Sequence, residues 1–251
     1  MHGISSPQNP HYKNWLKLLD GRGIRKYEQA LIFGRRFIFE IAAQFPERAI
    51  GLILKRESEA DGLALPAGCP LYLLPPELFD QLDIYGIRAP ILIVSAPPLP
   101  QWSGQLPPGL TVFVPFQNPI NLGTTIRSAA ALGASVVLLK EAATPYLPKS
   151  LRAAGPAIFR VPLLQGPGLE ELASAHVHLP IYALSPRGGN MFSFRFVNPM
   201  GLVAGLEGPG LDAYWPLEKR LSIPMDRQVE SLNASVAMSI AMSFHKAVWP
   251  A

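Results

Sequence analysis

The stretch from residue 110 to residue 139 constrains the fold of this chain most strongly. An apolar strand-like run (110–116) leads through a polar loop (117–123) into a small-residue helix pattern (124–133), and a second apolar run follows (134–139). A strand, a helix and a strand in this order are typical of the crossover that joins two parallel strands. Similar strand patterns recur at 179–185 and 201–207, and a helix pattern closes the chain at 231–248. The sequence therefore predicts an α/β domain with a parallel sheet over residues 110–251.

The first 94 residues also alternate between strand and helix patterns. Strand-like runs at 49–57 and 89–96 flank a strand-then-helix pattern at 70–82, and a mixed pattern precedes them at 28–45. Residues 97–109 are too rich in proline and glycine to form a core element. We therefore expect a small α/β domain over 1–94, a linker over 95–109 and the parallel-sheet domain over 110–251.

Basic and aromatic residues gather near the start of the chain, between Tyr12 and Arg36. Seven cations stand there against two acids, Asp20 and Glu28, with four aromatic rings among them. Such charge attracts phosphates, and exposed rings can stack on bases. The alternative is a solvated face whose aromatic rings lie in the core. The cations are Lys13, Lys17, Arg22, Arg25, Lys26, Arg35 and Arg36.

The composition excludes several classes of protein. Apolar residues form 49% of the 251 residues and charged residues 16%, a balance that argues against global disorder. Cys69 is the single cysteine, so neither an intrachain disulfide nor a cysteine-based metal centre is expected. The opening lacks a secretory pattern, and no apolar run reaches the roughly 18 residues of a membrane span. We expect a cytoplasmic protein without metal or membrane contact.

Three polar clusters follow predicted strands, where parallel sheets bind ligands. In the first, Asn121 falls where a helix N-cap would sit, and Arg127 interrupts an apolar helix, where a lone arginine commonly extends to solvent. The second, 205–210, has a spacing that matches neither a dinucleotide-binding fingerprint nor a phosphate-binding loop. In the third, 221–237, Ser231 is a plausible N-cap that would place Asn233 in the first helical turn.

Taken together, the three clusters resemble the three motifs of the SpoU/TrmH family of RNA ribose 2′-O-methyltransferases, within the SPOUT superfamily. The matching segments are NPINLGTTIR, GLEGPG, and IPM followed by VESLNASVA. The resemblance covers about residues 110–247, and its third motif is the most distinctive. Residues 1–94 resemble, more loosely, the ribosomal-protein-like RNA-binding module that precedes this domain in many members.

The resemblance implies a function and a set of site residues. It implies methyl transfer from S-adenosylmethionine to a ribose 2′-hydroxyl of structured RNA, either tRNA or rRNA, by a homodimer whose catalytic domain forms a trefoil knot. The residues that match the family's catalytic positions are Asn121, Arg127, Glu207, Ser231 and Asn233. Those that match its cofactor-binding segments are Gly205, Leu206, Ile223, Met225 and Leu232.

For Arg127 we expect a role in orienting the ribose and stabilising the developing alkoxide, because a guanidinium gives up its proton reluctantly. Glu207 would hold that guanidinium, and Asn121 with Asn233 would fix the loops.

The chain also departs from the family pattern. Leu206 and Arg227 lie nearest the expected cofactor, and Asn118, Ala154 and Pro156 also differ. These departures favour the main alternative, a non-catalytic RNA-binding or assembly factor that retains the methyltransferase fold. The glycine fingerprint of a dinucleotide-dependent oxidoreductase is absent from this sequence, which argues against that second alternative.

Overall fold

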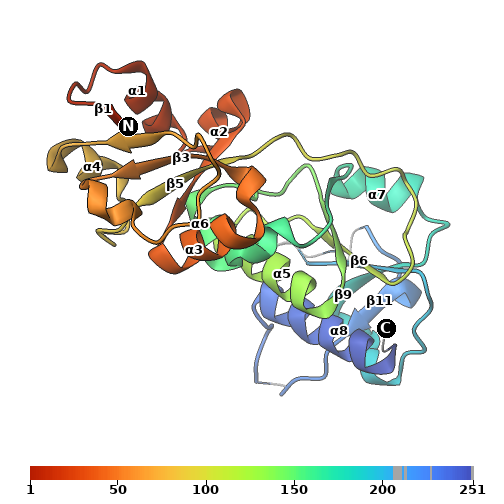
Figure 1. Ribbon diagram of the computed structural model, residues 1–251. Coiled ribbons are helices and arrows are strands. Elements are labelled where there is room, and N and C mark those ends of the chain that lie inside the picture. Colours follow the sequence, from red (N-terminus) through yellow and green to blue (C-terminus); the bar gives the residue numbers. More distant parts are fainter. Residues whose placement is uncertain (206–210, 212–213, 227, 250–251) are drawn as a thin grey trace. The chain divides into compact units, whose positions relative to one another are not determined.

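The computed structural model describes residues 1–205, 211, 214–226 and 228–249. The chain forms two compact units, each coloured along the sequence in Figure 1. Unit 1 comprises residues 1–98 with 144–156, and unit 2 comprises 99–143 with 157–251. The sequence-based boundaries place residues 144–156 in the second domain, whereas in the structure they pack with the first. Their sequence holds no strand pattern that could have indicated this packing.

Unit 1 is a five-stranded mixed sheet in the order β1-β4-β3-β5-β2. β5 runs antiparallel to both β2 and β3, whereas β4 runs parallel to β3 and β1. The elements of this unit are β1 (His2–Gly3), α1 (Pro10–Lys17), α2 (Gly21–Tyr27), β2 (Gln29–Phe33), α3 (Arg35–Gln44), β3 (Ala49–Leu54), β4 (Leu71–Leu73), α4 (Pro76–Leu82), β5 (Ile91–Ser95) and α6 (Pro148–Ala154), with 3-10 turns at Pro46–Arg48 and Glu57–Ala60.

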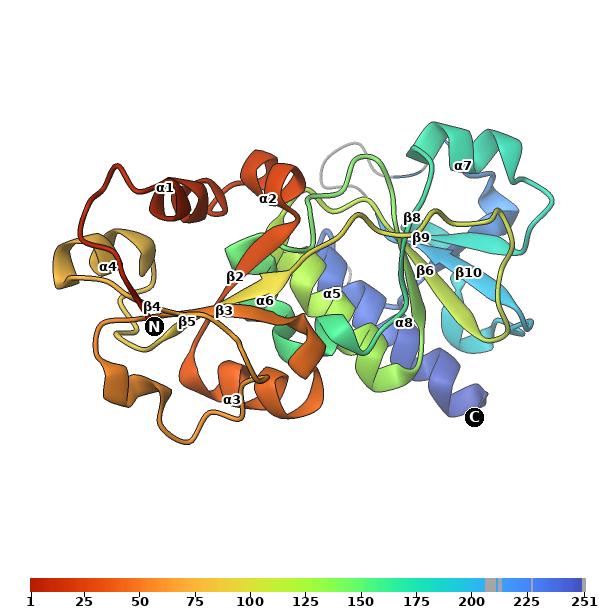
Figure 2. The same ribbon diagram turned by 45° about the horizontal axis from the view of Figure 1, so that its top comes forward.

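Helices cover both faces of this sheet because its strands alternate apolar side chains to either side. Alternate strand residues such as Leu31 and Ile93 join Trp15 of α1 and Phe79 of α4 in one buried cluster. In Figure 2, α1 and α2 lie on one side of the sheet and α3 on the other. α6 packs against β2 and buries Leu151.

Unit 2 is a six-stranded parallel sheet in the order β11-β9-β10-β6-β7-β8, as the crossover pattern predicts. Its elements are β6 (Leu110–Val114), α5 (Pro119–Leu132), β7 (Ser135–Leu138), β8 (Leu163–Gln165), α7 (Leu169–Ala175), β9 (Ile181–Asn190), β10 (Met200–Val203), β11 (Arg220–Ser222) and α8 (Ala234–Val248), with 3-10 turns at Met191–Ser193 and Leu217–Lys219. A further 3-10 turn, Gly155–Phe159, spans the point where the chain passes from unit 1 to unit 2.

Both helices that carry the motifs begin differently from the sequence prediction. α5 begins at Pro119 rather than at Thr124, because Asn118 caps it and proline suits the first helical position. The side chain of Asn118 accepts hydrogen bonds from the N–H groups of Ile120 (2.9 Å) and Asn121 (3.4 Å). The N-cap prediction for Asn121 is therefore wrong. At its other end, α5 closes on Gly133 in the left-handed conformation, as expected.

α8 begins two residues later than predicted. Its N-cap is Asn233 rather than Ser231, and the Asn233 side chain accepts from the N–H groups of Ser235 (3.0 Å) and Val236 (3.2 Å). Asparagine and serine cap helices about equally well, so residue type alone could not separate the two positions. α5 and α8 pack side by side in both ribbon views (Figures 1 and 2).

The proline-rich stretch predicted as a linker is partly anchored in unit 2. Trp102 and Pro100 exchange backbone hydrogen bonds of 2.8 Å each with Gln165 at the end of β8. The Trp102 ring packs edge-on against Phe113 at 5.0 Å between ring centroids. These contacts place the central part of the stretch along the sheet, where the composition had suggested only loop.

Candidate functional site

The parallel sheet brings the predicted motifs to one edge of unit 2. β6 and β10 are neighbours, and the N–H of Ala204 donates to the carbonyl of Phe113 (3.1 Å), so both strands end at the same level. Asn118 and Asn121 follow β6, and Gly205 follows β10. β11 is parallel to β9 at the side of the same sheet and leads directly into Ile223. The carboxyl edge of the sheet, the usual ligand crevice of such folds, therefore carries the first motif, Gly205 of the second and the Ile223 segment of the third.

A side-chain network joins the first motif to the third. Asn121 is only 7% exposed in the first turn of α5, and its Oδ1 accepts from Nδ2 of Asn233 (3.1 Å). The Oγ of Ser235 donates to Oδ1 of Asn233 (2.7 Å) and lies 3.5 Å from Oδ1 of Asn121. Two helix starts more than a hundred residues apart are thus held together by amide and hydroxyl groups.

Sequence reasoning missed Ser235, although a signal was present. Ser235 is 4% exposed and shares the buried face of α8 with Met238, Met242 and His245. A serine on the apolar face of a helix needs a hydrogen-bond partner when it is buried, and this position therefore pointed to a polar contact.

Arg127 and Ser231 are not joined to this network. Arg127 is exposed and takes part in no hydrogen bond or ion pair with any other described residue. Six residues beyond Asn121, it emerges about 120° around α5 from it, on the side shared with Thr124. Ser231 is exposed in the loop before α8. Within one chain, Arg127 is therefore not in hydrogen-bond contact with Asn121 or Asn233.

The segments that match cofactor-binding motifs provide backbone donors. Gly205, Ile223, Met225 and Leu232 are all half-buried. The N–H groups of Gly205, Ile223 and Leu232 donate to no acceptor among the described residues. Free donors beside half-buried apolar side chains fit an adenosine ligand, whose polar base edge and apolar surface need both. Leu206, Glu207 and Arg227 lie outside the described residues.

The loop that contains Ile223 is fixed by an unusually close crossing of two backbones. Ser222 pairs with Asn190, and Oγ of Ser222 donates to the carbonyl of Gly189 (3.2 Å). At Gly188, an added Cβ would lie 2.5 Å from the carbonyl carbon of Arg220. Only glycine allows β11 to pass this close to the end of β9.

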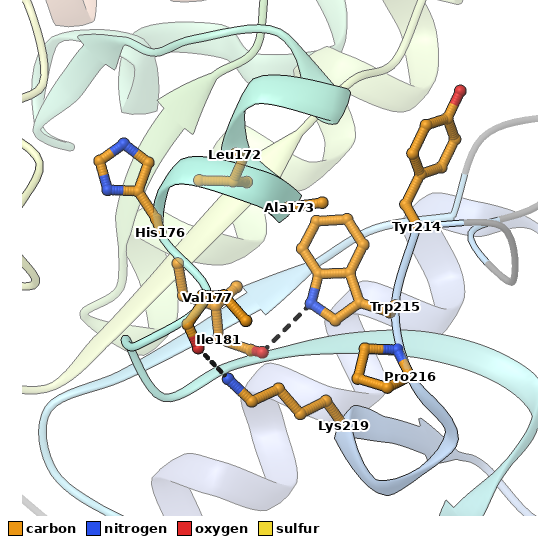
Figure 3. Close-up of a pocket in the computed structure, with 9 residues that line it drawn as sticks. All are labelled: Leu172, Ala173, His176, Val177, Ile181, Tyr214, Trp215, Pro216 and Lys219. Carbon is orange, nitrogen blue, oxygen red and sulfur yellow. Dashed lines mark hydrogen bonds between the residues drawn. The ribbon is translucent and has the colours of Figure 1, made fainter.

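A small pocket on unit 2, shown in Figure 3, anchors the chain just before β11. Nζ of Lys219 donates to the carbonyls of Val177 (2.5 Å) and Leu179 (3.1 Å), and Nε1 of Trp215 donates to the carbonyl of Ile181 (3.2 Å). The free volume of about 10 Å³ is close to the minimum for one water molecule. The hydrogen bonds of its lining residues therefore hold the start of β11 in place, and the pocket itself is too small for a substrate.

The outer face of α8 forms an open apolar groove. Val236 and Ile240 line it together with Phe244, and Phe192 packs edge-on against Phe244 at 4.8 Å between ring centroids. Thr124 of α5 completes one side. Val236 is 45% exposed and Phe192 47%, so large apolar groups face solvent in a single chain. Exposed apolar patches of this kind are typical of protein interfaces.

The described part of the chain contains neither a cluster of metal ligands nor a membrane-spanning helix. Its histidine, cysteine and acidic side chains form no group of three or more that could ligate a metal ion. None of the helices among residues 1–205 and 211–249, as far as described, combines the length and apolarity needed to cross a membrane.

Comparison with known proteins places these observations in a family. Residues 110–243 match the model of the SpoU rRNA Methylase family. The chain is 40% identical over 242 residues to "Ribosomal RNA small subunit methyltransferase G 2" of Syntrophobacter fumaroxidans, covering 95% of this chain and 48% of that protein. This chain thus spans about half the length of that relative. It is 29% identical over 248 residues to "23S rRNA (guanosine(2553)-2'-O)-methyltransferase RlmP" of Bacillus subtilis, covering 96% and 97%.

Solved structures agree with the fold. The SpoU methyltransferase AviRb from Streptomyces viridochromogenes, in complex with the cofactor AdoMet, superposes with a TM-score of 0.77 at 25% sequence identity. The superposition covers 96% of this chain and 98% of that one, so both units have counterparts there.

Proposed function

Because this chain belongs to the SpoU rRNA methylase family, we propose that it transfers a methyl group from S-adenosylmethionine to a ribose 2′-hydroxyl of RNA. The observation that carries the proposal is the junction of the first and third motifs through Asn121 and Asn233 at the carboxyl edge of the sheet. The B. subtilis relative, which matches over nearly the full length of both chains, is named as a 2′-O-methyltransferase of 23S rRNA. This name favours rRNA over tRNA as the substrate class.

The reaction needs a base or a hydrogen-bond donor near the ribose, and a site that holds the methyl donor in a fixed position. S-adenosylmethionine supplies an electrophilic methyl group on a sulfonium. The ribose oxygen forms the new bond to that methyl, the carbon–sulfur bond breaks, and the hydroxyl proton passes to solvent or a nearby base. Holding both reactants in line can contribute several kcal/mol to lowering the barrier. The backbone donors of Gly205, Ile223 and Leu232 would hold the cofactor.

Arg127 is the residue we assign to the ribose and its neighbouring phosphate. A guanidinium can bind a phosphate in a bidentate manner and stabilise the alkoxide that develops as the proton leaves. Its exposure leaves it accessible to a substrate. Glu207, which we propose as its partner, lies outside the described residues. Asn121 and Asn233 hold the two helix starts together, and Ser231 lies two residues before Asn233 in the exposed loop.

For RNA binding we propose a basic surface on unit 1, the α1–α2 patch. Its cations are exposed, and none forms an ion pair, whereas the ion pairs among the described residues of unit 1 lie elsewhere on it. Arg35 belongs to α3 on the other side of the sheet, where it donates to the carbonyls of Glu59 and Asp61. Unpaired cations suit a phosphate backbone. The α1–α2 patch consists of Lys13, Lys17, Arg22, Arg25 and Lys26.

We further propose that the chain acts as a homodimer through the groove on α8. The groove is apolar and partly exposed, and a second copy seated on it would cover Val236 and Phe192. Arg127 emerges from α5 on the same side as Thr124, which lines the groove, so a second copy would lie close to the arginine. The trefoil knot of the family and a cytoplasmic location remain parts of the same proposal.

A methylation assay with labelled S-adenosylmethionine and ribosomal RNA tests this function. We expect label at a ribose 2′-oxygen with the unaltered chain, and a loss of about 100-fold or more in rate for Arg127→Lys, because a point charge replaces the planar fork. Arg160→Lys, a change of another arginine of unit 2, is the matched control and should retain the rate.

Two results would count against the proposal. Binding of RNA without binding of S-adenosylmethionine in a calorimetric titration would favour the non-catalytic assembly factor. Full activity of Arg127→Lys would remove the arginine from the mechanism.

A further inference from the structure

Three polar contacts cross between α5 and α8, and we name them the α5–α8 seam. Two of them join Asn121 to Asn233 and to Ser235, and the third joins Oγ of Ser239 to Oγ of Ser128 at 2.8 Å. Ser235 and Ser239 of α8 are both at least partly buried, and the two are one helical turn apart. They differ in what they touch: Ser235 contacts the motif asparagines, whereas Oγ of Ser239 lies 2.8 Å from both Oγ of Ser128, outside the motifs, and the backbone carbonyl oxygen of Ser235.

Ser235 has a place in the network that neither asparagine can fill. Its Oγ donates to Oδ1 of Asn233 at 2.7 Å, the same oxygen that caps α8. That oxygen therefore faces α8, and the Nδ2 of Asn233 is turned toward Oδ1 of Asn121. Without the serine hydroxyl, the capping oxygen would keep its two backbone donors, but only the bond from Nδ2 to Asn121 would limit rotation of the amide plane about them.

The hydroxyl of Thr125 shows that burial next to the asparagines does not by itself lead to a hydrogen bond. Thr125 lies on α5 one turn after Asn121, is fully buried, and its Oγ1 has no hydrogen-bond partner among the described residues. A buried hydroxyl of α5, one turn from Asn121, thus forms no hydrogen bond with the described residues. The hydrogen bond of Ser235 therefore depends on its position next to Asn121 and Asn233 rather than on burial alone.

We propose that Ser235 is a positioning residue for the methyl-transfer site, a role that rests on the proposed function of that site. By fixing the amide of Asn233 against Asn121, it holds the loop before α8 to the start of α5. That loop contains Leu232, whose N–H is one of the backbone donors offered to the cofactor. Ser235 itself touches neither substrate nor cofactor.

The test compares Ser235→Ala with Ser239→Ala in the full chain. Each variant removes one serine hydroxyl from the seam, so we expect similar, small falls in melting temperature. Only Ser235→Ala should raise the calorimetric Kd for S-adenosylmethionine, by roughly 3- to 10-fold, the ratio that removal of one hydrogen bond ordinarily produces. Ser235→Cys, which keeps a side chain of similar length with a weak donor, should resemble Ser235→Ala.

Hydrogen exchange supplies a readout that does not depend on activity. The amides of Ser235 and Val236 donate to Oδ1 of Asn233, so they should exchange faster in Ser235→Ala and remain unchanged in Ser239→Ala. Equal exchange in the two variants would overturn the positioning role. If the unaltered chain binds no S-adenosylmethionine, the proposed function fails, and the exchange comparison still decides the role of Ser235 in holding the loop.

Discussion

The crossing of β11 over the end of β9 offers a stringent test of the site's architecture. A Cβ added at Gly188 would lie 2.5 Å from the carbonyl carbon and 2.7 Å from the carbonyl oxygen of Arg220, and 2.6 Å from the nitrogen of Leu221. Non-bonded carbon atoms are normally separated by about 3.5–4.0 Å. Gly188→Ala therefore requires one of the two backbones to move by about 1 Å.

β11 has little freedom to make that movement. Nε of Arg220 donates to the carbonyl of Trp215 (2.6 Å). The side chain of Trp215 donates to the carbonyl of Ile181 at the start of β9, and that of Lys219 donates to the carbonyl of Leu179 just before it. Overpacking at such a site costs roughly 1–3 kcal/mol in the free energy of unfolding. For a unit of this size, about 4 °C is lost per kcal/mol, so the melting temperature should fall by about 4–12 °C.

The neighbouring glycine is a matched control. At Gly189 the nearest atom to an added Cβ is 3.9 Å away, and neither glycine adopts the left-handed conformation, so Gly189→Ala should be tolerated. Because Ser222 pairs with Asn190 and leads into Ile223, Gly188→Ala should also weaken binding of S-adenosylmethionine. Equal melting temperatures for the two variants, measured by calorimetry, would refute the close crossing of β9 and β11.

Three further predictions concern other parts of the chain. Neutralising the α1–α2 patch should reduce the slope of log K for RNA against log salt by about 0.7–0.9 for each phosphate that the patch no longer neutralises, whereas neutralising Arg56, which is paired with Glu59, should leave it unchanged. Leu151→Ala should cost about 2–5 kcal/mol and reduce hydrogen-exchange protection in β2, whereas Leu217→Ala, at a 63% exposed position, should have no effect. Burial lowers the pKa of His245, so the unfolded chain binds more protons near pH 6 and stability should fall as pH drops below about 6.5. In urea unfolding, His245→Asn should reduce this slope.

Part of the candidate site could be predicted from the sequence through the resemblance of its three motifs to the SpoU/TrmH family. Asn121 and Asn233 were selected by their place in those motifs, and the structure joins them directly. The positions of the caps were not readable in the same way. Four candidate residues have side chains that can cap a helix: Asn118, Asn121, Ser231 and Asn233. Which of them forms the cap depends on where the preceding strand ends and the chain turns into the helix. Ser235 was missed because a short serine in an apolar helix pattern has little weight by itself.

The sequence by itself determined the parallel sheet of unit 2, the mixed strands and helices of unit 1, and the three loops that carry the motifs, since these follow from apolar periodicity and turn residues over short distances. Only the tertiary structure decided that residues 144–156 pack with unit 1, that β11 crosses the end of β9 at Gly188, and that Ser235 reaches the asparagine pair. These features arise from contacts between residues distant in the chain, and such contacts depend on how whole elements pack rather than on any local pattern.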